Sequence, residues 1–255
     1  MQRRNLYLIS TAYLLLITFA ELLTIYHAKA GIAVHAVIMF ALLLHSALES
    51  DKDKRLSRFL MVLPIAPLIR IVSLSTPLTY FSRISWFLLI SIPIFIATFT
   101  CLWLQALRPK EIGISLPNLR DIPIEASVII LALPWGIMEY QILKPAPLPI
   151  GAAPNFIFAA LILIVCTGFL EELIFRGLFE FHAIRLLSKW WGILIVSTIF
   201  GVLHLGNLAL LDCLLAFWVS IVYAVVREKT GSIYGISISH GLINITLFLI
   251  APVYF

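Results

Sequence analysis

The chain has 255 residues, of which 62% are hydrophobic and 12% charged, with a mean hydropathy of +1.05 and a formal net charge of +5. Soluble domains are roughly 45–50% apolar and about 25% charged, so the composition excludes an ordinary soluble protein and predicts a membrane protein. No block of Lys and Arg interleaved with aromatic residues is present. We therefore expect the positive surplus to contact anionic lipid of the bilayer, and no nucleic acid.

Apolar runs of spanning length, separated by short polar or Pro-rich turns, predict an all-α bundle of eight or nine transmembrane helices. The run 59–74 is the weakest, because it is short and contains Pro64, Pro67 and Arg70. As a tilted or re-entrant segment, it would leave eight spans. The expected helices cover 6–26, 31–48, 59–74, 86–107, 124–142, 154–181, 190–206, 211–226 and 231–251.

Basic residues predict the orientation of the bundle, because cytoplasmic loops carry an excess of Lys and Arg. With the N-terminus in the cytoplasm, thirteen of them fall on the cytoplasmic side and only Lys29, Arg83 and Lys144 fall outside. We expect residues 1–107 to form accessory N-terminal helices and 108–123 a cytoplasmic linker. The cytoplasmic set is Arg3, Arg4, Lys52, Lys54, Arg55, Arg58, Arg108, Lys110, Arg120, Arg185, Lys189, Arg227 and Lys229.

Two adjacent carboxylates, Glu171 and Glu172, lie inside the apolar run 163–177, with Arg176 one turn later. An ionised side chain near the bilayer centre costs at least about 2.5–3.5 kcal/mol, so this pair needs a specific role. Glu172 and Arg176 are neighbours on one helix face, whereas Glu171 is turned about 100° away. The spacing predicts a structural Glu172–Arg176 pair and a Glu171 that is free to handle protons.

Two later spans also hold polar side chains: His204, with Phe200 one turn before it, and His240 with Asn244 one turn after it. An imidazole and a carboxamide side by side suit hydrogen-bond donation to a developing oxyanion. At 1.5 Å rise per residue, Glu171 and His240 come about 15 Å deep, and His204 and Asn244 about 20 Å deep. Three helices thus bring their polar groups to nearly the same level.

These three patterns, Glu171-Glu172-x-x-x-Arg176, Phe200-x-x-x-His204 and His240-x-x-x-Asn244, resemble the motifs of the CPBP family of intramembrane proteases (CAAX protease and bacteriocin-processing, or Abi). The resemblance implies a protease core over 124–255 with a polar cavity opening toward the cytoplasm. It implies that Glu171 and His204 activate water and that His240 and Asn244 stabilise the oxyanion. Its substrate would be a membrane-associated protein or peptide of the CAAX-processing, bacteriocin-immunity or C-terminal sorting type. We expect an integral protein of a prokaryotic cell (inner) membrane.

The metal requirement stays open between two mechanisms. Glu171, His204 and His240 are residue types that bind zinc. The chain lacks H-E-x-x-H, however, and an amide beside His240 is a better oxyanion donor than metal ligand. A metal-free, glutamate-type mechanism without a cofactor is therefore favoured over a zinc protease.

Two other functions fit buried polar groups: a proton-coupled transporter that uses Glu, His and Arg as a relay, and a non-catalytic scaffold. No inverted repeat supports the transporter, and the scaffold leaves Glu171 and both histidines without a role. Glu21, Arg70 and Glu139 lie toward helix ends, where we expect them to snorkel.

Overall fold

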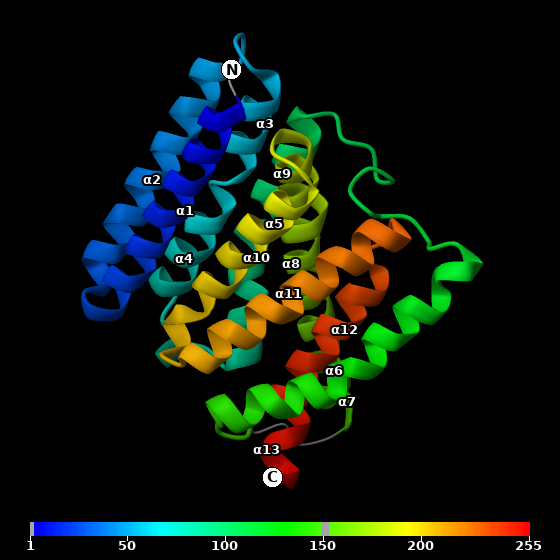
Figure 1. The fold of residues 1–255 in the computed structure, drawn as a ribbon. Helices are drawn as coiled ribbons and strands as arrows, with labels where there is room; N and C mark the ends of the chain where they lie inside the picture. The colour runs from blue at the N-terminus through cyan, green and yellow to red at the C-terminus, as the bar shows by residue number, and fades with distance from the viewer. Residues whose placement is uncertain (1–2, 149–152) are drawn as a thin grey trace.

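The computed structural model describes residues 3–148 and 153–255, and all regular secondary structure within these ranges is helical (Figure 1). The predicted all-α membrane bundle is confirmed. Within the described residues, nine helices are long and apolar enough to cross a membrane: Arg4–Tyr26, Ala28–Glu49, Lys54–Ser75, Arg83–Leu104, Leu119–Leu143, Asn155–Leu186, Lys189–Asn207, Leu210–Thr230 and Tyr234–Tyr254.

The third of these spans contains the segment predicted to be weakest, and it is a broken helix. Proline lacks a backbone N–H and its ring crowds the preceding turn, so Pro64 interrupts the helix between its two halves. The side chain of Asp53 starts the first half by accepting the N–H groups of Arg55 and Leu56. The N-terminal elements are α1 (Arg3–Tyr26), α2 (Ala28–Glu49), α3 (Lys54–Val62), α4 (Ile65–Ser75), the short helix η1 (Leu78–Tyr80) and α5 (Arg83–Leu104).

The second half of the chain surrounds one long helical segment, which runs from α7 to α9 through two π-helical stretches. Helix α12 packs along its first π stretch and against α6. The elements are η2 (Leu119–Asp121), α6 (Ile122–Leu143), α7 (Ala153–Ile162), η3 (Leu163–Phe169), α8 (Leu170–Glu172), η4 (Leu173–Glu180), α9 (Phe181–Leu186), α10 (Lys189–Val202), η5 (Leu203–Asn207), α11 (Leu210–Thr230), α12 (Tyr234–Ile245), η6 (Thr246–Ile250) and α13 (Ala251–Tyr254).

The segment expected as a linker is bonded to the turn between α11 and α12. The N–H of Ile233 donates to the carbonyl of Gly113 at 2.9 Å, and Arg227 Nη2 donates to the carbonyl of Glu111 at 2.7 Å. Gly113 has a φ of +82°, a conformation that a glycine adopts readily. These bonds tie the chain between α5 and α6 to the same end of the bundle as the α11–α12 turn.

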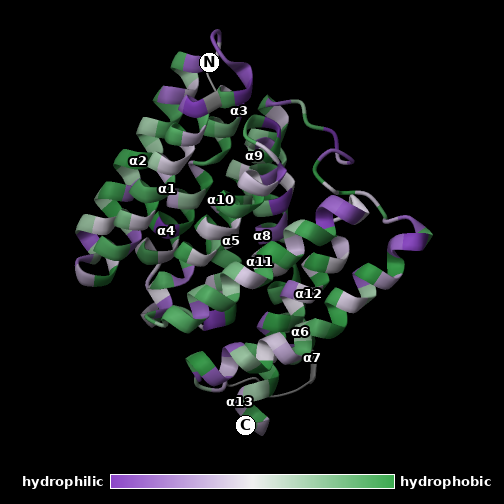
Figure 2. Cartoon of the chain, in the orientation of Figure 1, coloured by the Kyte–Doolittle hydropathy of each residue, from purple (hydrophilic) through white to green (hydrophobic). Residues whose placement is uncertain are grey.

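Hydrophobic residues predominate along the helices, and many of the hydrophilic residues lie at the helix ends and in the loops (Figure 2). Large apolar residues such as Phe19, Phe40, Trp103 and Ile130 are more than half exposed. A surface of this kind is stable in a lipid environment and would aggregate in water. The chain is an integral membrane protein.

Candidate active site

His240 contacts both adjacent glutamates of the central helix. Its Nδ1 lies 2.7 Å from Glu172 Oε1, and its Nε2 lies 3.8 Å from Glu171 Oε2. The Glu172 side chain is fully buried, whereas that of Glu171 is 34% exposed. The two carboxylates therefore occupy different environments, one inside the protein and one facing an open space.

Glu172 forms a buried ion pair with Arg176. Nη1 of Arg176 lies 3.1 Å from Oε1 and 3.0 Å from Oε2 of Glu172, and neither side chain has any exposed surface. The guanidinium also lies over the rings of Phe200 and Tyr223, with Cζ 4.9 and 5.4 Å from the two ring centres. A cation between aromatic faces is stabilised by their quadrupoles. Arg176 thus joins the glutamate-bearing helix to α10 and α11.

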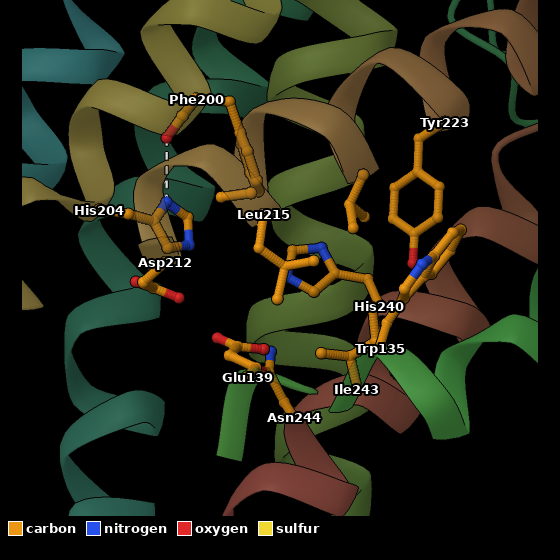
Figure 3. A pocket seen from close by; sticks show the side chains of 12 residues that line it. Trp135, Glu139, Phe200, His204, Asp212, Leu215, Tyr223, His240, Ile243 and Asn244 are labelled. Atoms are coloured by element: carbon orange, nitrogen blue, oxygen red, sulfur yellow. Dashed lines mark hydrogen bonds between the residues drawn. The ribbon is translucent and has the colours of Figure 1, made fainter. Parts of the chain in front are cut away.

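His204 lies in the 3₁₀ segment η5, just after the end of α10. Its Nδ1 is 3.0 Å from the backbone carbonyl of Phe200 (Figure 3). Because a carbonyl oxygen only accepts hydrogen bonds, Nδ1 must carry the hydrogen of this contact. The neutral imidazole then has a free lone pair on Nε2, which is the form that accepts a proton from a bound water.

Asn244 is held by a residue that sequence reasoning missed. Its Nδ2 donates to Thr167 Oγ1 at 2.8 Å, and the Thr167 hydroxyl donates to the carbonyl of Leu163. The amide has two N–H groups, so one of them remains for another acceptor. The sequence signal that could have identified Thr167 is a hydroxyl side chain inside an apolar run, one turn before Glu171.

Close approach of α12 to η3 brings these groups together. A Cβ atom on Gly168 would lie 2.5 Å from the carbonyl oxygen of Ser237 and 2.7 Å from the nitrogen of Gly241. A Cβ on Gly241 would in turn lie 2.8 Å from the Cα of Ile164. Only glycines allow two helix backbones to pack at this distance.

A cavity of about 520 Å³ lies where these side chains meet, and it is lined by Glu171, His204, His240 and Asn244. Thr167, Phe200 and Cys166 also contribute to its wall. The structure therefore places residues from all three motifs around one space, whereas Glu172 and Arg176 are fully buried and do not line it.

A smaller adjoining pocket is lined by His204, His240 and Asn244 together with two carboxylates, Glu139 and Asp212 (Figure 3). Sequence reasoning gave Glu139 little weight and did not consider Asp212. Each is a single acidic residue in a different helix, so no local pattern connects them with the three motifs. Asn207 Nδ2 donates to Asp212 Oδ2 at 2.8 Å, which fixes that carboxylate beside η5.

The zinc ligands considered from the sequence do not form a donor set here. Within the described part of the chain, no three His, Cys, Asp or Glu side chains lie close enough together to hold a metal ion. Nδ1 of His204 and Nδ1 of His240 are bonded to protein oxygens, which leaves Nε2 of each ring for a water molecule or a metal ion. In the described part of the chain, Glu171, His204 and His240 therefore do not lie together as a preformed three-ligand zinc site.

A second buried polar cluster lies in the N-terminal helices and reaches the site. Arg70 binds both carboxylate oxygens of Glu21: its Nε donates to Oε1 at 2.9 Å, and its Nη2 lies 2.7 Å from Oε2. His35 approaches the same carboxylate, with Nε2 at 3.3 Å from Oε1. Nη2 of Arg70 also donates to the carbonyl of Leu203 at 2.6 Å, one residue before His204. The expectation that Glu21 and Arg70 snorkel is wrong, because tertiary packing pairs them inside the bundle.

Comparison with protein-family models matches residues 153–246 to the family described as Rce1-like, "Type II CAAX prenyl endopeptidase Rce1-like". No curated protein and no solved structure matches the chain. The matched range contains every residue of the three motifs, and the resemblance stated from them is confirmed. Residues 153–246 of this integral membrane protein therefore match an Rce1-like domain of the CAAX protease family, a family of intramembrane proteases.

Proposed function

We propose that the chain is an intramembrane endopeptidase that hydrolyses a peptide bond of a membrane-associated protein or peptide. The observation that carries this proposal is the single cavity lined by Glu171, His204, His240 and Asn244. The family match favours a protease over the proton-coupled transporter. Within that family, the proposal covers CAAX processing, bacteriocin immunity and C-terminal sorting.

Glu171 and His204 activate the attacking water. Glu171 presents a partly exposed carboxylate to the cavity, and the free Nε2 lone pair of His204 accepts a proton. As the water oxygen bonds to the carbonyl carbon, its proton moves to one of these bases. The same proton then passes to the leaving nitrogen when the C–N bond breaks.

His240 and Asn244 donate to the oxyanion of the tetrahedral intermediate. For Nε2 of His240 to donate, the ring must be protonated at both nitrogens, with Nδ1–H directed to Glu172. In that form, Glu171 and Glu172 carry two negative charges, and Arg176 and His240 carry two positive ones. These four groups then carry no net charge together, which favours their burial in a medium of low dielectric. The second N–H of Asn244 completes the oxyanion site.

The catalytic test compares the wild type with Glu171→Gln by intact mass spectrometry of membrane-protein and secreted-peptide pools from expressing cells. We expect a cleavage product that is lost in the variant, because a positioned general base contributes about 10²–10⁴-fold. Glu49→Gln is the matched control, since it makes the same chemical change far from the cavity. Identical products in all three strains, at equal protein abundance, would favour the transporter or scaffold.

Metal dependence is tested on the purified protein. The metal-free mechanism predicts that a zinc-stripping chelator leaves the cleavage rate unchanged, because the bases and oxyanion donors are protein side chains. Activity that is lost with the chelator and restored by zinc would establish the metalloprotease instead.

A further inference from the structure

The cavity lies at one end of the bundle, and the lining residues show which end. Its wall runs from His240 and Phe175 in the middle of the bundle to Leu78, Arg83 and Pro145. These last three residues lie in or beside the connections after α4 and α6. The cavity therefore reaches the surface at the end of the bundle opposite the start of α1 (Figure 1).

The excess of basic residues lies at the other end. The thirteen Lys and Arg residues near one set of helix ends lie at the start of α1 and in or near the α2–α3, α5–α6, α9–α10 and α11–α12 connections. None of these thirteen side chains lines the cavity. At the end where the cavity reaches the surface, the basic residues are Lys29, Arg83 and Lys144.

Two expectations drawn from the sequence therefore disagree. The family resemblance implies a cavity that opens toward the cytoplasm, whereas the basic residues place the cytoplasm at the end away from the cavity. The overall Lys and Arg bias of the short connections sets the orientation of a membrane protein, and here four connections and the N-terminal region all point the same way. The basic residues of this chain therefore decide its orientation more directly than resemblance to other chains.

We infer that the catalytic cavity opens toward the non-cytoplasmic side of the membrane, so that the substrate is a membrane-anchored protein segment that has already been translocated. This inference rests on the proposed endopeptidase function for the nature of the occupant. It selects exported proteins, cleaved near their membrane anchor, over tails that remain in the cytoplasm. The scissile bond would enter between the start of α5 and the end of α6 and reach Glu171 from there.

A native cysteine makes the direction of access measurable. Cys166 lines the cavity and is partly exposed, whereas Cys101 and Cys213 lie outside its wall. With Cys101→Ala and Cys213→Ala in place, Cys166 becomes the reporter thiol. Ser73→Cys, in a Cys166→Ala background, supplies a second cavity reporter from α4, because Ser73 also lines the wall.

The experiment treats right-side-out and inside-out vesicles with a charged maleimide that does not cross membranes. Two controls mark the faces: Tyr80→Cys, at a residue that is 80% exposed on the cavity end, and Asp51→Cys, exposed on the basic end. We expect Cys166, Ser73→Cys and Tyr80→Cys to react in right-side-out vesicles, and Asp51→Cys only in inside-out vesicles.

Three results would overturn the inference. The cavity thiols could react only in the vesicles in which Asp51→Cys reacts, or they could react in neither kind of vesicle. The two controls could also react in the opposite vesicles from those expected. Labelling does not need catalysis, so the same pattern in Glu171→Gln separates this inference from the proposed function. If labelling is as expected but no Glu171-dependent product exists, the access side stands and the endopeptidase fails. If products exist, their cleavage sites must lie in translocated segments.

Discussion

At the scale of single residues, Glu172 is the acceptor that organises the site. One carboxylate oxygen, Oε1, receives both Arg176 Nη1 and His240 Nδ1. Sequence spacing predicted the first contact, since the two residues are one turn apart. The second joins residues 68 positions apart and aims His240 Nε2 at the cavity side where Glu171 lies. Glu172 therefore links the stability of the bundle to the orientation of a catalytic side chain.

Arg176→Ala should lower the free energy of unfolding by about 3–5 kcal/mol, because it leaves the Glu172 carboxylate buried without its cation. Thermal unfolding in detergent and abundance in the membrane measure this loss. Arg176→Lys is the matched control: it keeps the charge but loses the planar group between Phe200 and Tyr223, so we expect a smaller loss. Wild-type stability in Arg176→Ala would show that the ion pair does not support the fold.

At the scale of elements, the glutamates lie on a short α-helical turn between two π-helical stretches. A third π stretch, η6, follows Asn244. π-helical turns are rare and are frequently found at functional sites. Regular 3.6-residue periodicity was therefore the wrong description of the residues flanking α8, although the predicted contact between Glu172 and Arg176 still forms. The first of these stretches, η3, lies where the glutamate helix packs against α12, and the second, η4, packs against α10 and α11.

Gly168→Ala tests the importance of that contact. The added methyl group would meet only backbone atoms, at 2.5 Å from Ser237 O and 2.7 Å from Gly241 N, so the helices must separate. We expect about 1–3 kcal/mol of destabilisation, and a lower cleavage rate per folded molecule because the Glu172–His240 contact lengthens.

Gly231→Ala is the control for Gly168→Ala. Its φ of +69° makes the substitution strained by about 1–2 kcal/mol, but its Cβ meets nothing within 4 Å. It should lower stability to a similar degree and leave the rate per folded molecule unchanged. An equal loss of rate in both variants would mean that global stability, and not helix separation, controls activity.

At the scale of the whole molecule, the N-terminal helices reach the catalytic half through Arg70. The guanidinium of Arg70 is held by Glu21 from α1 and donates to the carbonyl of Leu203, at the start of the segment that carries His204. The last carbonyls of a helix lack partners within the helix, so this bond fixes the end of α10. Residues 1–107 were expected to be accessory, and this contact gives them a role in positioning His204.

The double variant Glu21→Gln/Arg70→Gln tests this role, because removing both charges avoids leaving either one buried alone. We expect the variant to fold and its kcat to fall by about 10²-fold, since a displacement of about 1 Å at a catalytic group has that effect. Glu21→Gln alone keeps the Arg70–Leu203 bond and should lose less. A stable double variant with wild-type kcat would reduce the N-terminal helices to scaffold.

The sequence by itself determined the class of fold, a count of eight or nine spans and the resemblance to the family. Composition and run length decide whether a segment is stable in lipid, and these are local properties that need no knowledge of neighbours. The i, i+4 spacings of Glu172–Arg176 and His240–Asn244 place each pair on one helix face. Short-range geometry of a helix is fixed by its hydrogen bonds, so such pairs can be read directly.

Only the tertiary structure decided which distant groups share a space. Thr167 on Asn244, Arg70 on Leu203, and Glu139 with Asp212 beside the histidines all join elements far apart in the chain. None belongs to a repeating pattern, and their side chains meet because small residues let specific helix pairs approach. Packing of helices in the membrane depends on complementary surfaces of several elements at once, so the cavity, its lining and the end at which it reaches the surface follow from the assembled bundle.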